Sequence, residues 1–272
     1  MNQIRAIIVA SLIILITLIS VPLQFLFIQT KLPLRFWLPV LYHNIALKLM
    51  RFKIHTHGHF STHRPLLIVS NHTSWLDILV LSTFKPCSFI AKSEIASWPV
   101  FGMLAKLQRT LFINREKKGD AQKTNQALHK RLSRGEPMIL FAEGTTSEGT
   151  RVLPFKSALF GVASMMQDEN ASSRNDKNAD KDNVALYVQP VCVTYQKLQG
   201  LPLNRISRLH TAWIGDMDLM PHLWNIIKGG PIDVLVSFGE PIAVEHGFNR
   251  KKLAQDAENA VRKMNVKALR GE

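Results

Sequence analysis

The feature that most constrains the fold of this chain is an apolar segment near its N-terminus. Ile7–Ile28 contains no charged side chain, and about 20 apolar residues suffice to cross a bilayer as a helix. Because backbone groups in lipid must be hydrogen-bonded within their own segment, we expect a membrane-anchoring helix here. A cleaved signal peptide is the alternative. It fits poorly, since the apolar run is too long and no small-x-small cleavage site follows it.

The distribution of positive charge around this segment predicts its orientation. Arg5 precedes it, whereas five lysines and arginines lie within residues 31–53. The heavier positive side is C-terminal, so we expect the bulk of the protein to be cytoplasmic. Residues 33–50 form a second, less apolar stretch with Trp37 and Tyr42, types that suit a membrane interface. One span plus an interfacial helix, or a hairpin in one leaflet, both agree with this pattern.

Composition indicates the kind of partner. The 272-residue chain has a formal net charge of +14, which favours nucleic acid, an acidic membrane surface or an acidic carrier protein. The basic residues are scattered and form no nucleic-acid module. We therefore expect the protein to bind an anionic membrane surface and not nucleic acid. Cys87 and Cys192 lie in apolar runs without metal or redox spacing. They are expected to be buried thiols of a reducing compartment.

Beyond residue 60, short apolar runs alternate with longer helical patterns. Several runs lack the polar alternation of a half-exposed strand, which favours burial on both faces of a sheet. The alternation predicts an α/β fold with a central, mostly parallel sheet flanked by helices. The predicted strands are Leu66–Ser70, Ser88–Ala91, Thr110–Asn114, Met138–Ala142, Ala185–Tyr195 and Ile232–Phe238, and the predicted helices are Ala121–Arg134, Ser157–Met166 and Asn249–Leu269.

Two regions follow from these patterns. Residues 1–53 are expected to form the membrane anchor, an apolar helix plus an interfacial helix, and residues 54–272 a single α/β domain. Within that domain, residues 167–183 contain no large apolar side chain. We expect a solvated, mobile loop there rather than a domain boundary.

The sharpest motif is NHTSWLD at residues 71–77, directly after the first predicted strand. His72 and Asp77 suggest a base and its orienting carboxylate. On one continuous helix their side chains would lie about 140° apart. They can therefore pair only if His72 lies in the turn after the strand and Asp77 in the next helix. The alternative is a capping histidine with a surface aspartate. Ser74 is too close to His72 for a hydrolase triad and is expected to cap the helix.

A second motif, FAEGTTSEG at residues 141–149, also follows an apolar run. Glycine and threonine at a strand end can present backbone N–H groups to an anion. The segment is not a nucleotide-binding loop, because Thr150 and Arg151 replace Lys-Ser/Thr. Nor is it a nucleophile elbow, since the spacing around Ser147 is one residue too long.

Three cations follow predicted strands or turns. The run LFINR at residues 111–115 ends in Arg115, and arginine at a strand end can grip a phosphate bidentately. Lys92 and Lys156 could join it. An exposed strand-ending arginine is the alternative. His55, His57 and His59 alternate, but no acidic or thiolate ligand accompanies them, so we expect an exposed strand face and no metal site.

Taken together in this order, four blocks resemble the lysophospholipid acyltransferases, with the bacterial 1-acylglycerol-3-phosphate acyltransferases as the most similar group. They are NHxSxxD at 71–77, FINR at 112–115, FxEGT at 141–145 and VQPV at 188–191. The resemblance implies that His72 is the general base and Asp77 its partner. It implies acceptor-binding roles for further residues: Arg115 and Lys92 on the phosphate, and Glu143, Gly144 and Thr145 shaping the acceptor site.

Two positions depart from that family's third block. Ala142 stands where proline is usual, and Thr146 stands where arginine is usual, which removes one expected phosphate contact. Arg151 or Lys156 could compensate. The longer run EGTTSEGTRVLPFK at residues 143–156 is also similar to acyltransferases that complete ornithine lipids.

The expected reaction is transfer of a fatty acyl group from an acyl thioester to the sn-2 hydroxyl of 1-acyl-glycerol-3-phosphate, which forms phosphatidic acid. The donor is expected to be acyl-carrier protein or acyl-CoA, with no metal, no cofactor and no covalent enzyme intermediate. One alternative is a lyso-ornithine lipid O-acyltransferase. An alternative of another class is an inactive, membrane-bound lipid-binding protein, which the presence of His72, Asp77, Glu143 and Arg115 disfavours.

Overall fold

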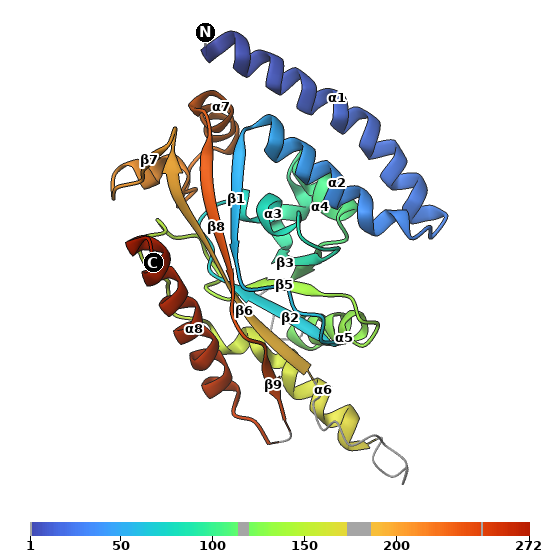
Figure 1. The fold of residues 1–272 in the computed structure, drawn as a ribbon. Coiled ribbons are helices and arrows are strands. Elements are labelled where there is room, and N and C mark those ends of the chain that lie inside the picture. The colour runs from blue at the N-terminus through green and yellow to red at the C-terminus, as the bar shows by residue number, and fades with distance from the viewer. Residues whose placement is uncertain (1, 114–119, 173–185, 246) are drawn as a thin grey trace.

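A central nine-stranded sheet organises the protein (Figure 1). The structure is a computed structural model that describes residues 2–113, 120–172, 186–245 and 247–272. Two short strands, β7 (Leu201–Pro202) and β9 (Ile242–Val244), pair with β6 outside the main path. That path runs β1 (Phe52–His57), β8 (Ile232–Phe238), β6 (Leu186–Leu198), β2 (Leu66–Ser70), β5 (Met138–Phe141), β3 (Ser88–Lys92) and β4 (Leu111–Ile113).

Strand direction follows the predicted, mostly parallel pattern. Strands β6, β2, β5, β3 and β4 run parallel to one another. At one side, β8 is antiparallel to β6 and parallel to β1. Every residue of β2 and β5 is buried, as their continuous apolar runs predicted. Ser70 pairs with Phe141 of β5 and Val191 of β6, so the carboxyl ends of β2 and β5 lie side by side, next to the middle of the longer strand β6.

Helices cover both faces of the sheet, each over its own apolar cluster. One face packs against α5 (Asp120–Leu132), α6 (Gly161–Ser172) and α8 (Arg250–Arg270). The other packs against α1 (Asn2–Gln29), α2 (Leu34–Leu49), α3 (Leu76–Leu81) and α7 (Leu219–Gly229). A short helix, α4 (Phe101–Leu107), lies between β3 and β4 in sequence. The fold is therefore the three-layered α/β arrangement expected from the alternation of strands and helices.

One predicted segment needs correction. The helix expected at Ser157–Met166 is a 3-10 turn, Ser157–Phe160, followed by α6, which continues to Ser172. Residues 167–172, predicted as loop, are therefore helical. They include glutamine, glutamate and alanine, which favour helix although they are not large apolar residues. The remainder of the predicted mobile loop, residues 173–183, lies outside the described residues.

The N-terminal helices form a hairpin that lies along the domain (Figure 1). Helix α1 is long and apolar enough to cross a membrane, since an 18-residue stretch within residues 3–29 has a mean hydropathy of 2.8. Near its start, Arg5 donates to the carbonyl of Ile227 in α7 at 2.7 Å. Near its end, the Gln24 amide donates to the carbonyls of Arg35 and Leu107, both at 2.9 Å. Helix α1 is thus attached to the domain at both ends.

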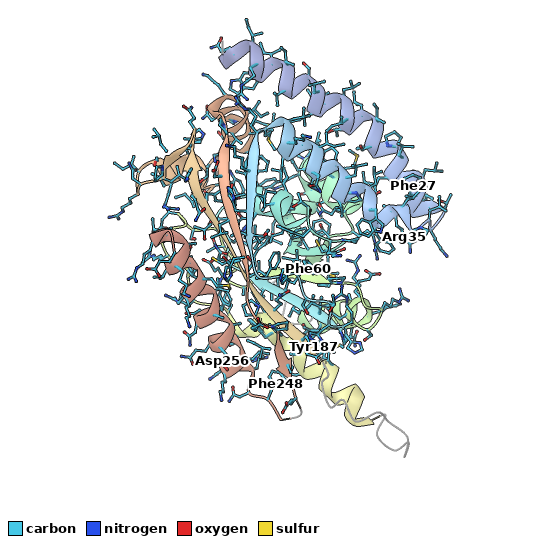
Figure 2. All side chains as sticks on the ribbon, viewed as in Figure 1. Phe27, Arg35, Phe60, Tyr187, Phe248 and Asp256 are labelled. Carbon is cyan, nitrogen blue, oxygen red and sulfur yellow. The ribbon has the colours of Figure 1, made fainter. Side chains whose placement is uncertain are left out.

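Much of the opposite side of α1 has no protein cover. The exposed fractions of Ile7, Leu18 and Phe25 are 56%, 68% and 58%. Figure 2 shows Phe27 and Arg35 on the two sides of the turn that joins α1 to α2. An uninterrupted apolar surface of this kind marks α1 as a candidate membrane anchor. The sheet begins at Phe52, so residues 52 and 53 belong to β1 in the structure.

Candidate active site

The site is built around a histidine–aspartate pair between β2 and α3. His72 lies in the turn after β2, and Asp77 lies in the first turn of α3. The His72 Nδ1 atom is 2.9 Å from Asp77 Oδ2. The histidine side chain is 17% exposed, whereas the aspartate is fully buried. The strand–turn–helix geometry predicted from their spacing is confirmed.

Backbone groups of the same turn hold the Asp77 carboxylate. Oδ2 accepts from the amides of Thr73 and Ser74 at 2.7 and 2.9 Å. The expectation that Ser74 caps α3 is wrong: Trp75 is the N-cap residue, and the buried Ser74 hydroxyl has no hydrogen-bond partner among the described residues. The Asp77 carboxylate in the first turn of α3 instead reaches back to the two amides that precede the helix, as the acidic residue of a capping box does.

Tyr195 of β6 completes the surroundings of Asp77. Its hydroxyl donates to Asp77 Oδ1 at 2.7 Å. Burial and the nearby carboxylate raise the pKa of Tyr195 well above its usual value, so it remains a donor. The sequence offered no local sign of this contact, since 118 residues separate the two. Only the neighbouring positions of β2 and β6 in the sheet bring them together.

The imidazole of His72 is also fixed from its flat side. It stacks on Phe141 with ring centroids 3.8 Å apart and planes 11° apart. The preceding residue, Asn71, attaches the turn to β6 through its side-chain amide. The Nδ2 atom donates to the Val193 carbonyl at 2.9 Å, and Oδ1 accepts from the Val193 backbone amide at 2.8 Å. With Nδ1 held by Asp77, Nε2 is the ring atom left to exchange a proton with a substrate.

Glu143 supports His72 from the end of β5. Its Oε1 accepts from the His72 amide at 2.8 Å, and Oε2 accepts from the Leu153 amide at 3.0 Å. The residue is only 1% exposed. Burial raises the pKa of Glu143 to about 7, and the two backbone bonds oppose that rise. Glu143 thus positions the turn that carries the histidine.

The loop after β5 closes over the same turn. Gly144 has a φ of 72° and its amide donates to Phe141 at 3.1 Å, which starts a tight turn. Further along, the Ser147 amide donates to the His72 carbonyl at 2.8 Å. Thr145 between them is exposed. The predicted acceptor segment is therefore adjacent to the histidine, as its motif suggested.

The lysine side chains that were predicted to bind the acceptor are not in contact with the His72–Asp77 pair in the described part of the structure. Lys92 ends β3 and is exposed, and Lys156 is exposed while its amide donates to the Ala142 carbonyl at 2.9 Å. Within the described ranges, neither ammonium contacts His72 or Asp77. Arg115 lies outside the described residues. The structure thus brings together His72, Asp77 and Glu143, with Gly144 and Thr145 in the loop beside them.

Comparison with known proteins gives four informative likenesses. Residues 51–194 match the sequence profile of the family described as Acyltransferase. The lyso-ornithine lipid O-acyltransferase of Brucella abortus is 44% identical over 270 residues, 99% of this chain and 97% of that one. That of Rhizobium meliloti is 36% identical over 99% and 89%. The crystal structure of the Thermotoga maritima 1-acyl-sn-glycerophosphate (LPA) acyltransferase PlsC has a TM-score of 0.65 at 18% identity, with 98% and 97% covered.

Proposed function

The chain belongs to the lysophospholipid acyltransferase family, and we propose that it transfers a fatty acyl group to the free hydroxyl of a lyso-ornithine lipid. The observation that carries this proposal is the end-to-end identity to two lyso-ornithine lipid O-acyltransferases. The acceptor expected first from the sequence, 1-acyl-glycerol-3-phosphate, has less support. The end-to-end likeness to the Thermotoga enzyme extends to the fold alone at 18% identity.

The reaction uses the histidine–aspartate pair as a general base. Acceptor and acyl thioester bind together, and Nε2 of His72 takes the proton of the acceptor hydroxyl as its oxygen attacks the thioester carbonyl. The tetrahedral intermediate collapses, the carbon–sulfur bond breaks, and the thiolate leaves and takes up a proton from the imidazolium. Asp77 keeps the ring oriented and stabilises its positive charge in between. Backbone amides stabilise the oxyanion.

The donor and the remaining partners follow from charge. Acyl-carrier protein and acyl-CoA are both anionic, and a protein with a net charge of +14 attracts either of them as well as an anionic membrane surface. The mechanism requires no metal and no cofactor. An inactive lipid-binding protein is the weaker proposal, because several hydrogen bonds hold the turn that carries His72, while Nε2 of His72 has no hydrogen-bond partner among the residues that the structure describes.

The anchor is best understood as a hairpin in one leaflet. Arg5 and Gln24 attach opposite ends of α1 to the same domain. A helix held in this way cannot cross a bilayer while its domain stays on one side. The exposed side of α1 would instead lie in the cytoplasmic leaflet of the inner membrane, with the catalytic domain in the cytoplasm.

Purified full-length protein can be tested with two acceptors, lyso-ornithine lipid and lysophosphatidic acid, each with an acyl-carrier-protein and a CoA thioester. We expect kcat/KM for lyso-ornithine lipid to exceed that for lysophosphatidic acid by at least about tenfold. The reverse preference would contradict this proposal and support a 1-acylglycerol-3-phosphate acyltransferase instead. Activity with neither acceptor, in protein that is folded, would favour a lipid-binding role.

A further inference from the structure

The loop that closes over His72 continues into a short charged segment. Ser147 is tied to the His72 carbonyl, and Gly149 approaches Thr73 so closely that an added Cβ would lie 3.1 Å from the threonine Cγ2. These two contacts place residues 148–151 beside the histidine turn. The segment therefore lies next to the turn that carries His72, and among the described residues the side chains of Glu148 and Arg151 make none of the hydrogen bonds that hold His72 and Asp77.

Two opposite charges stand on that segment. Glu148 Oε1 accepts from the Thr150 hydroxyl at 2.9 Å and lies 3.6 Å from Arg151 Nε. Both side chains stay accessible, with exposed fractions of 36% for Glu148 and 71% for Arg151. Its own backbone amide and Thr150, helped by Arg151 and Arg205, lower the pKa of the Glu148 carboxyl. The Glu148 carboxyl is thus ionised at neutral pH, and together with the Arg151 guanidinium it gives this segment a negative as well as a positive charge.

A carboxylate here suits some acceptors and opposes others. A phosphate head group could bind Arg151, but Glu148 beside that arginine repels the phosphate, and Thr146 adds no second cation at the position where the phosphate-binding pattern has an arginine. Ornithine has one carboxyl and two amino groups. When its α-amine is acylated, it keeps a carboxylate and a side-chain ammonium, which are the complements of Arg151 and Glu148.

We propose that Glu148 and Arg151 form the head-group site for an amino-acid lipid, with Glu148 binding the side-chain ammonium and Arg151 the carboxylate. This inference rests on the proposed function. A structural ion pair is the simpler reading of the same contact. Exposed pairs of this kind stabilise a fold little, however, so both residues can be replaced without unfolding the protein.

The test pairs each variant with an acceptor analogue that lacks the matching charge. Full-length Glu148→Gln and Arg151→Gln proteins are assayed with three acceptors. The first is lyso-ornithine lipid itself. The second is the analogue with norvaline in place of ornithine, which lacks the terminal amine, and the third is lyso-ornithine lipid whose carboxyl group is a methyl ester. We expect Glu148→Gln to raise KM for lyso-ornithine lipid about fivefold, and to change KM for the norvaline analogue far less. Arg151→Gln should show the same selectivity between lyso-ornithine lipid and the methyl ester.

Matched controls are Glu272→Gln and Arg270→Gln, which alter an exposed pair with a 3.9 Å separation at the C-terminus. They should leave every KM unchanged. Equal losses with all three acceptors would overturn the head-group site, because they would mean that the segment only positions His72. Unchanged KM values in both variants would overturn it as well. If the wild-type protein does not acylate lyso-ornithine lipid at all, the proposed function itself fails, which is a distinct result.

Discussion

At the scale of single residues, the candidate site consists of the proposed base, His72, and the groups that hold it in place. Asp77 has four hydrogen-bond donors around its carboxylate, among them His72 and Tyr195. Spacing alone predicted the first of these, because a turn between strand and helix is the one geometry in which residues five apart can meet. Tyr195 and the clamp formed by Asn71 depend on which strand neighbours β2, and no local pattern encodes that.

Replacement of the base tests the mechanism directly. His72→Ala should lower kcat by at least about a hundredfold, the lower range for loss of a general base. Its thermal unfolding should change little, since Asp77 keeps three other donors. His55→Ala is the matched control, because His55 is an exposed histidine on β1. Turnover within a few-fold of wild type in folded His72→Ala protein would contradict the assigned role.

Glu143 predicts a pH dependence of stability. Its pKa is raised from 4.5 to about 7 in the folded protein, chiefly by burial. The unfolded chain loses this proton first, so the folded state becomes progressively less stable as pH rises from about 4.5 through 7. A shift of that size corresponds to a cost on the order of 3 kcal/mol above pH 8.

Urea unfolding of wild type and Glu143→Gln between pH 4.5 and 8.5 measures this effect. Glutamine loses one of the two backbone bonds, so the variant should be less stable at pH 4.5. As pH rises, the free energy of unfolding of the wild type should fall relative to that of the variant. A difference that stays constant across the range would show that Glu143 does not titrate as described.

At the scale of elements, continuous apolar runs were the most informative pattern. The bounds of β2 and β8 were predicted to the residue, because each is a buried strand between turn residues. Helices α4 and α7 and the short strands β7 and β9 were not predicted. Helix α7 contains proline and glycine, and the two short strands are too brief to show a period. Their positions depend on tertiary contacts.

The hairpin arrangement of α1 can be checked by labelling. Asn2→Cys and Thr30→Cys, made separately, place a thiol at either end of α1. Both should react with a membrane-impermeant maleimide from the cytoplasmic side in inverted inner-membrane vesicles. The unsubstituted protein is the blank, since burial raises the pKa of Cys87 and Cys192 to about 12 and slows their reaction. Labelling of the two ends from opposite sides would establish a transmembrane span.

At the scale of the whole molecule, composition and strand–helix alternation predicted the α/β class and a membrane-bound, basic protein. They did not separate a span from a hairpin. That distinction depends on a hydrogen bond between Arg5 and Ile227, which are 222 residues apart in sequence. Sequence patterns also left two acceptors open, because the catalytic motifs are common to the family; the head-group site proposed here lies in the loop beside those motifs.

The net charge of +14 predicts how binding to lipid depends on salt. At 0.1 M ionic strength the Debye length is about 10 Å, and at 1 M it is about 3 Å. Association with vesicles that contain anionic lipid should therefore be faster than with zwitterionic vesicles at low salt, and the two rates should converge near 1 M. Stopped-flow energy transfer from the five tryptophans of the protein to a labelled lipid measures this. Equal rates at low salt would contradict an electrostatic contribution.

The bonds around Asp77 also affect how variants of this protein are to be sorted. The carboxylate of Asp77 accepts hydrogen bonds from Thr73, Ser74 and Tyr195, and these bonds stabilise the turn after β2. Loss of Asp77 should therefore lower the stability of the protein as well as its turnover. His72 contributes far less to that closure. In a random library sorted only for well-folded protein, Asp77 would survive while His72 was freely replaced. In such a library, the presence of Asp77 would indicate only that a variant folds. The presence of His72 would be needed to distinguish active variants from inactive ones.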